Sequence, residues 1–268
     1  MTETYKKIQD TQNISDAVKY YWGYQYRLAD EAIIPYLTDE GAFKLQHKVM
    51  EIGCAEGGVL AAFVENKASY AAGTDIVASR LESGKHITSI AGLKIDFVEH
   101  DILEDAINDD WLDAFDLVLL RDVIEHLEKP ELALRNIHKI LKPGGHLYVT
   151  FPPYNSPFGG HQHTVANKLG KLPFIHHLPD RLFHKMIETG RENDIGEVKR
   201  LQKIRLSPEQ FVYAAKRENY QIVKEEHYLL RPVFKMKFGI PSLSLGNMAS
   251  NKFMRNYVSM EASYLLKK

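Results

Sequence analysis

Histidines are concentrated in one stretch of the chain. Residues 156–184 read SPFGGHQHTVANKLGKLPFIHHLPDRLFH and contain His161, His163, His176, His177 and His184. Because an imidazole titrates near neutral pH, one of them could remove a proton from a hydroxyl during a reaction. His161 is the first candidate for such a base and His163 the second, since the chain from 151 to 160 leaves the carboxyl end of a predicted strand. The alternative is that these histidines cap turns or lie on the surface.

The spacing of His161 and His163 also raises the question of a metal site. A His-x-His pair in an extended chain presents both rings on one face. The stretch contains no cysteine, its only carboxylate is that of Asp180, and no further ligand spacing is recognisable. The sequence therefore predicts no bound metal.

A second chemical feature is the turn of small residues in HKVMEIGCAEGGVL. An apolar run ends at Gly53, and Cys54, Ala55 and Gly57 then keep large side chains away from the backbone. After a strand of an α/β sheet, such a turn lets the polar groups of a ligand approach backbone amides. The Gly-x-Gly-x-x-Gly fingerprint of dinucleotide-binding oxidoreductases is absent from it. Glu51 lies inside the apolar run, where a buried carboxylate is costly, so we expect it to contact a donor or a cation.

Acidic residues mark the ends of the next two predicted strands. Asp75 ends one strand, at about the distance from the turn where an acid accepts ribose hydroxyls in nucleotide-binding folds. Asp101 ends the following strand. For each carboxylate, helix capping is the alternative role. Cys54 has no visible base beside it and is expected to pack rather than to act as a nucleophile.

Alternating strand and helix patterns position these residues. Short apolar runs bounded by turn residues predict strands, and longer amphipathic segments predict helices. Parallel strands need crossover connections and are buried on both faces, so the alternation indicates a parallel sheet covered by helices. The predicted strands are residues 49–53, 70–75, 95–100, 115–120, 146–151, 220–230 and 257–266. The predicted helices are residues 15–37 (one or two helices), 57–65, 78–90, 130–141 and a segment that begins at Ser207.

The alternation breaks after residue 151. Residues 152–206 are rich in proline and glycine, with short helical pieces between them, which indicates a lid inserted into the sheet domain. The sequence thus predicts a single domain with three parts. They are an N-terminal helical cap at 1–46, a core at 47–151 and 207–268, and the lid at 152–206.

The segment 231–253 combines basic and apolar residues and contains no acid. It could accept an amphipathic or anionic small molecule, touch a membrane surface or form a homodimer contact. A plain solvated basic loop is the remaining alternative.

Composition narrows the classes of partner. The chain has 268 residues, of which 44% are hydrophobic and 26% charged, as in an ordinary soluble globule. Its formal net charge is −1, so no overall field attracts nucleic acid. A single cysteine excludes an internal disulfide, and neither an apolar signal core nor a run of membrane-spanning length is visible. We therefore expect a cytoplasmic protein that does not bind nucleic acid.

Several segments, taken in order, resemble the class I S-adenosylmethionine-dependent methyltransferases. The resemblance is strongest to the methyltransferase type 11 group, which includes ubiquinone and menaquinone biosynthesis enzymes. The segments lie within residues 47–151 and read VMEIGCAEGG, AAGTDI, VEHDILE and FDLVLLRDVIEHLEKPELALRNIHKILKPGGHLYVTFP. The resemblance implies an α/β, Rossmann-like, doubly wound fold: a mostly parallel seven-stranded sheet with helices on both faces. It also implies S-adenosylmethionine as the cofactor.

By this resemblance, the turn 53–57 lies against the methionine part of the cofactor. Asp75 accepts its ribose hydroxyls, and Asp101 with Ile102 borders its adenine. Ala55 departs from the family, which usually has a glycine at that position. The predicted cofactor-binding residues are Glu51, Gly53, Cys54, Ala55, Gly57, Asp75, Ile76, Asp101, Ile102, Arg121, Asp122 and His126.

The resemblance implies methyl transfer by in-line displacement, in which the protein mainly positions the acceptor and excludes water. We expect a small-molecule acceptor, with oxygen as the methylated atom. The alternatives are a protein or RNA methyltransferase, and a non-catalytic module that binds the cofactor or a partner. The neutral charge and the apolar lid disfavour the first, and the intact series of motifs disfavours the second. The sequence does not identify the acceptor.

Overall fold

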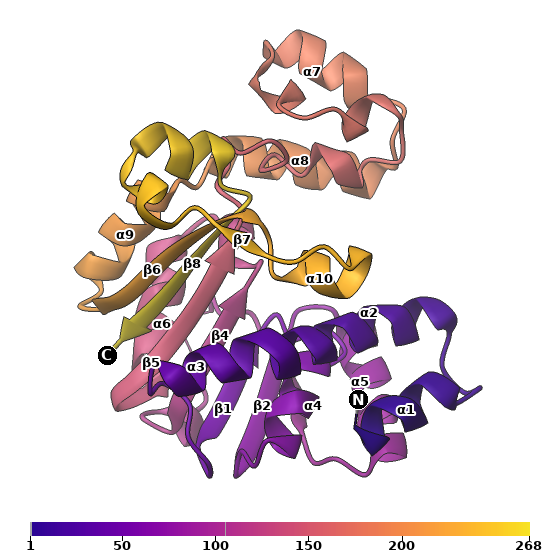
Figure 1. The fold of residues 1–268 in the computed structure, drawn as a ribbon, viewed down its shortest axis with the longest axis vertical. Coiled ribbons are helices and arrows are strands. Elements are labelled where there is room, and N and C mark those ends of the chain that lie inside the picture. The colour runs from indigo at the N-terminus through magenta and orange to yellow at the C-terminus, as the bar shows by residue number, and fades with distance from the viewer. Residues whose placement is uncertain (1, 105) are drawn as a thin grey trace.

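The computed structural model describes residues 2–104 and 106–268, and within them one eight-stranded sheet runs through the molecule (Figure 1). The strand order is β3-β2-β1-β4-β5-β8-β6-β7. Pairings among β1 to β5 are parallel, whereas β8 is antiparallel to both β5 and β6. The strands are β1 (Lys48–Ile52), β2 (Tyr70–Asp75), β3 (Asp96–Glu99), β4 (Phe115–Arg121), β5 (Leu141–Phe151), β6 (Gln221–Leu230), β7 (Leu243–Ser244) and β8 (Glu261–Lys267).

This arrangement confirms the predicted doubly wound, mostly parallel sheet, with one strand more than the seven predicted. The additional strand is β7, in which Leu243 pairs with Leu230 and Ser244 pairs with Tyr228 of β6. A strand of two residues leaves no alternation in the sequence, so the periodicity could not reveal it.

Helices cover both faces of the sheet. In β4, Leu117 and Leu119 pack toward α2, α4 and α5, whereas Val118 and Leu120 pack toward α6 and α9. All four side chains are fully buried, as expected for a parallel strand with helices on both sides. The helices are α1 (Glu3–Asp10), α2 (Asp16–Leu28), α3 (Ile34–Asp39), α4 (Gly58–Glu65), α5 (Ala78–Ala91), α6 (Pro130–Ile140), α7 (Asp180–Ile187), α8 (Glu192–Ile204), α9 (Pro208–Arg217) and α10 (Val233–Phe238).

The aromatic cluster at the N-terminus divides its rings between packing and exposure. Trp22 and Tyr26 of α2 are buried and stack with ring centroids 5.2 Å apart, whereas Tyr20 is 57% exposed. Tyr21 and Tyr24 turn toward the carboxyl ends of the strands and line a cavity described below. Helix α2 therefore serves both as a packing layer over α4 and as a wall of that cavity.

The segment 152–206, called the insertion below, has a small apolar core of its own. Its members are Val165, Ile175, Phe183, Ile187 and Val198. Figure 1 shows its helices α7 and α8 beyond the end of the sheet to which the parallel strands point. The insertion is thus placed where a lid over a ligand would have to lie.

Two predicted segments differ in the structure. The strand expected at 257–266 begins only at Glu261, because residues Met254–Val258 form a π-helical turn. The Asn256 amide donates to both carboxylate oxygens of Glu209 on α9, at 3.0 and 3.1 Å, which holds that turn in place. The segment 231–253 was expected to be a loop but contains α10 as well as β7.

The helices can be checked for the ability to span a membrane. Among residues 2–104 and 106–268, no helix has the length and apolar character needed to cross a membrane.

Candidate active site

A cavity of about 770 Å³ lies beyond the carboxyl ends of β1, β2 and β4, between the sheet, α2, α8 and α10. All predicted cofactor-binding residues line this cavity except Gly57. Ligands of open α/β sheets bind at this edge, because the turns after the strands converge there. The cavity also lies in the size range of small-molecule and cofactor sites.

The turn after β1 brings its backbone to the cavity wall. Gly53 has a φ of +73°, and a Cβ there would collide with the side chain of Val123. Gly57 has a φ of +75°, and a Cβ there would stand 2.6 Å from the Phe97 ring. Glycine is therefore required at both positions for conformation and for space. Ala55 between them holds a left-handed φ of +49° despite its Cβ, which is the position where the resemblance expects a glycine.

The two acids at the strand ends are held by backbone amides. The Asp75 carboxylate accepts hydrogen bonds from the amides of Ala55 and Val77, both at 2.9 Å. Asp101 accepts one from the amide of Leu103, also at 2.9 Å. The contacts to Val77 and Leu103 are local turn contacts to the amide two residues on, and neither is a helix cap, because α5 begins at Ala78 without a side-chain cap and residues 102–104 form a turn. Each carboxylate oxygen has a second lone pair, so these contacts leave capacity for a ligand hydroxyl at the cavity.

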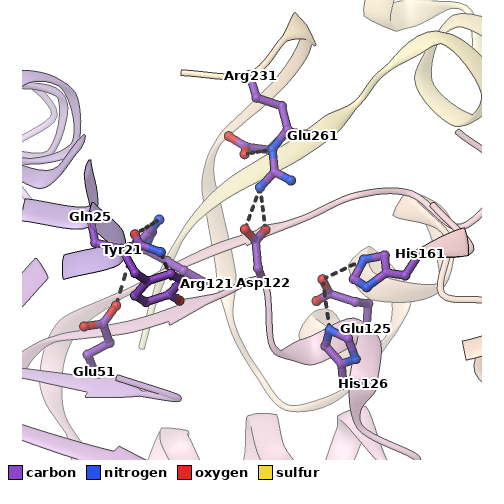
Figure 2. A network of polar contacts seen from close by, with 10 residues as sticks. All are labelled: Tyr21, Gln25, Glu51, Arg121, Asp122, Glu125, His126, His161, Arg231 and Glu261. Carbon is purple, nitrogen blue, oxygen red and sulfur yellow. Dashed lines mark hydrogen bonds and ion pairs between the residues drawn. The ribbon is translucent and has the colours of Figure 1, made fainter. Parts of the chain in front are cut away.

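Glu51 contacts the cation that its burial required. Its carboxylate lies 3.5 Å from a guanidinium nitrogen of Arg121, which also donates to the side chain of Gln25 at 3.1 Å (Figure 2). Burial raises the pKa of Glu51 to about 7, although the charge of Arg121 opposes this rise. Glu51 can thus change its charge near neutral pH in response to a ligand.

Asp122 belongs to a second, partly buried ionic group, which the sequence did not predict. The Arg231 guanidinium donates to both oxygens of Asp122, at 2.6 and 2.8 Å, and to Glu261 at 2.7 Å. Burial by itself would raise the pKa of Asp122, but the Arg231 charge outweighs burial and lowers it. Arg231 is separated from both acids in the chain, so only the folded sheet could reveal this link between β4, β6 and β8.

A third polar group surrounds Glu125 and contains His126 and His161. Glu125 is 3% exposed, and its carboxylate lies 3.7 Å from Nε2 of His126 and 3.8 Å from Nε2 of His161 (Figure 2). The other ring nitrogen of His126 contacts Glu197 of α8. His126 lines the cavity as predicted, whereas Glu125 was not singled out from the sequence. The only sequence signal was an acid directly before that histidine.

The two predicted catalytic histidines lie outside the lining of the cavity. Neither His161 nor His163 is among the residues that line the cavity. Burial lowers the pKa of His161 to about 3 and that of His163 to about 4, so both are neutral at pH 7. The ring of His161 is 4.9 Å from that of His126, which brings the insertion against the rim of the site. Their role as bases stays a prediction.

Part of the chain is similar in sequence to known proteins. Residues 50–147 match the family described as methyltransferase domain. A ubiquinone biosynthesis O-methyltransferase from Vibrio atlanticus (strain LGP32) is 28% identical over 127 residues, which cover 47% of this chain and 52% of that protein. The chain thus spans about half the length of the curated relatives it matches.

Solved structures are similar to this chain over most of its length. At these low identities the similarity concerns only the fold. An S-adenosylmethionine dependent methyltransferase from Mesorhizobium loti aligns with a TM-score of 0.56 and 16% identity, over 90% of this chain and 100% of that one. The cyclase SpnF aligns with a TM-score of 0.54 and 15% identity, over 91% of this chain and 81% of that one. The same fold therefore carries more than one kind of chemistry, and the site has to decide the function.

Proposed function

We propose that this chain is a class I S-adenosylmethionine-dependent methyltransferase, and that it transfers a methyl group from that cofactor to a small molecule, with oxygen as the acceptor atom. The observation that carries the proposal is the cavity of about 770 Å³ framed by the turn after β1 and by Asp75 and Asp101. The glycine turn, the acids and the pocket all lie at the edge of the sheet where a nucleotide-like ligand binds.

The residues present fit the cofactor. Gly53 leaves the backbone open where any side chain would collide with Val123. Asp75 is fixed by two amide hydrogen bonds and keeps lone pairs for the hydroxyls of a ribose. Glu51, whose pKa is raised to about 7, offers a carboxylate that a cationic ligand would favour in its ionised form.

When bound, the cofactor supplies a methyl group on a sulfonium, and the acceptor atom forms its bond to carbon as the bond from carbon to sulfur breaks. The chain's own contribution is positioning and exclusion of water. Tyr21 and Tyr24 of α2 close one side of the cavity, and Glu197 and Arg200 of α8 close the other. His161 and His163 stay our predicted bases, and their neutral imidazoles keep a lone pair for a proton.

Contact of the segment 231–253 with a membrane surface or with a second copy of the chain stays a proposal as well. The segment 231–253 exposes apolar side chains next to its lysines, with Phe238 64% exposed and Phe253 61% exposed. A membrane surface or a second copy of the chain would fit such a face. A cytoplasmic location likewise stays a prediction.

Calorimetric titration with S-adenosylmethionine and with its demethylated product tests the cofactor part of the proposal. We expect Asp75→Asn to weaken binding by about 1.5 to 3 kcal/mol, or roughly 10- to 150-fold, because it removes a charged acceptor. Asp16→Asn is the matched control, since the Asp16 side chain is fully exposed on α2. An absence of binding to the wild type, or equal affinity in a folded Asp75→Asn variant, would contradict the proposal.

Incubation of the protein with methyl-labelled cofactor and a metabolite extract tests the acceptor class. Label in a small-molecule fraction supports the proposal. Label only in protein or RNA would favour a macromolecular acceptor, and binding without any transfer would favour a non-catalytic module.

A further inference from the structure

The polar cluster of Glu125, His126 and His161 has the composition of a metal site. Each residue offers one ligand atom, and these atoms all lie within 4.8 Å of one another. Glu125 and His126 come from the turn after β4, and His161 comes from the insertion. Figure 2 shows the carboxylate of Glu125 between the two imidazole rings.

Glu125 lacks the partners that a buried carboxylate needs. Among the residues that the structure describes, neither of its oxygens has a hydrogen-bond partner, and the residue is 3% exposed. Leaving such a group without partners costs free energy, so native proteins rarely keep one without a reason. A cation held jointly with the two imidazoles would satisfy the oxygen that both rings face.

We propose that Glu125, His126 and His161 bind a divalent transition-metal ion, and that zinc is the ion which this ligand set selects. Two histidines and one carboxylate form a known ligand set of catalytic zinc, with the fourth position left open. Magnesium is disfavoured, because it prefers oxygen ligands. With bonds of about 2.0–2.1 Å, the ligand atoms of a tetrahedral site stand roughly 3.3 Å apart. The measured 3.7 and 3.8 Å are within reach of that separation by small side-chain rotations.

The surroundings fix the orientation of the His126 ring. Nδ1 of His126 contacts Glu197, which also accepts from Arg200 at 2.8 Å, so Nε2 is left facing Glu125. A carboxylate on the far nitrogen of a histidine ligand is the usual support of such sites. The Nε2 atoms of His126 and His161 both face the same oxygen of Glu125, as shared coordination of one ion requires.

The sequence argument against a metal rested on the absence of a carboxylate close to the histidine pair. The fold supplies that carboxylate from Glu125, which is 36 positions away from His161 in the chain. His126, Glu197 and Arg200 line the cavity, so the ion would border the ligand site. Its use in catalysis rests on the proposed function: it would lower the pKa of an acceptor hydroxyl, whose proton passes to water. His161, as a ligand, would then no longer serve as the base, and of the two predicted bases only His163 would keep that role.

Zinc titration of the chelator-treated full chain tests the site without any substrate. We expect one tightly bound ion per chain, and affinity at least about 100-fold weaker in Glu125→Gln and in His161→Gln. Glu197→Gln should lose about 10- to 100-fold, as expected for a residue that only positions a ligand. His86→Gln is the matched control, because His86 is exposed on α5 and far from the cluster in sequence. Cobalt titration adds a visible absorption signal, which Glu125→Gln should abolish.

Circular dichroism establishes whether each variant is folded. If Glu125→Gln does not fold, the zinc affinity of His161→Gln tests the site on its own. Zinc affinity in Glu125→Gln and His161→Gln equal to that of His86→Gln would overturn the site, as would a wild type that retains no ion. Cofactor titration on the same chelated samples separates the two proposals. Cofactor binding without zinc binding overturns only the metal site, whereas zinc binding without cofactor binding overturns only the proposed function.

Discussion

Glu51 is the residue at which charge and stability are most directly linked. It is 4% exposed, and burial raises its pKa from the ordinary 4.5 to about 7, against the opposing charge of Arg121 and with a smaller contribution from Asp75. The folded protein therefore holds a proton on Glu51 at pH values where the unfolded chain has lost it. The resulting stabilisation is complete below pH 4.5 and is lost as pH rises through 7.

We expect Glu51→Gln to remove this part of the pH dependence, because an amide cannot ionise. Relative to the wild type, the variant should gain on the order of 3 kcal/mol in free energy of unfolding between pH 4.5 and pH 8. Urea denaturation of both proteins at several pH values measures the difference. Two parallel stability curves would show that Glu51 does not titrate in this range.

At the residue scale, the sequence could predict that a buried charged side chain requires an interaction partner, but it could not identify which residue provides it. It required a cation near Glu51 because a carboxylate lay in an apolar run, and the structure supplies Arg121. It could not identify Arg231 as the partner of Asp122, since that pairing depends on how β4 and β6 meet across β8 and β5. Glu125 was missed for the same reason, because its neighbours come from two distant segments.

At the scale of elements, strands with continuous apolar runs were predictable and short or polar elements were not. β1, β2 and β4 lie within one residue of their predicted bounds, because only apolar residues suit strands buried on both faces. The predicted last strand wrongly included Tyr257 and Val258, whose side chains favour strands. In the structure they end the turn Met254–Val258, which the contact from Asn256 to Glu209 stabilises. α1 was not predicted either. It is an eight-residue helix capped by Thr2, too short for a clear period.

The contact between α2 and α4 depends on one glycine. A Cβ on Gly58 would stand 2.6 Å from the carbonyl oxygen of Trp22 and 3.3 Å from the amide nitrogen of Tyr26. Both are backbone atoms of α2, which cannot rotate away. We therefore expect Gly58→Ala to cost about 1 to 3 kcal/mol in free energy of unfolding, the range for overpacking.

Gly196→Ala is the matched control for that substitution. Gly196 also lies in a helix, α8, but an added Cβ there meets no atom within 4 Å among the described residues. The helix preference of alanine should make this variant as stable as the wild type or up to about 1 kcal/mol more stable. Denaturant titration compares the two, and equal stability of both variants would mean that α2 and α4 do not pack as closely as the structure indicates.

At the scale of the whole molecule, Arg231 joins parts of the chain that are distant in sequence. It lies just after β6 and donates to Asp122 after β4 and to Glu261 in β8. Replacing it by methionine keeps most of the volume but leaves the buried carboxylate of Glu261 and the partly exposed carboxylate of Asp122 without their cation. We expect Arg231→Met to lower the free energy of unfolding by about 3 kcal/mol, the low end of the range for broken buried pairs, because solvent screens the partly exposed Asp122.

Arg135→Met is the control for the loss of an arginine pair as such. Arg135 contacts Glu218 at 2.9 Å, but its side chain is 55% exposed, so its loss should change the free energy of unfolding much less than the loss of Arg231. Urea denaturation measures both variants. A cost of less than about 1 kcal/mol for Arg231→Met would show that the ionic group is not held together by this guanidinium.

The insertion should behave as a unit that opens separately from the sheet. Its apolar core contains only Val165, Ile175, Phe183, Ile187 and Val198, whereas the strands are covered on both faces. Amides of the insertion should therefore exchange with solvent faster than those of β1 and β4, and should gain protection when the demethylated cofactor product and an acceptor bind.

The contact between Glu197 and His126 is the clearest side-chain link between α8 and the rim of the sheet. Glu197→Gln weakens that link by removing the charge, so we expect faster exchange of amides in α8 with no change in β1 or β4. Glu192→Gln, on the exposed side of the same helix, should leave exchange as in the wild type. Hydrogen exchange followed by mass spectrometry resolves these segments. Exchange of the insertion at the same rate as the central strands, with or without ligand, would mean that it is part of one cooperative core and cannot open as a lid.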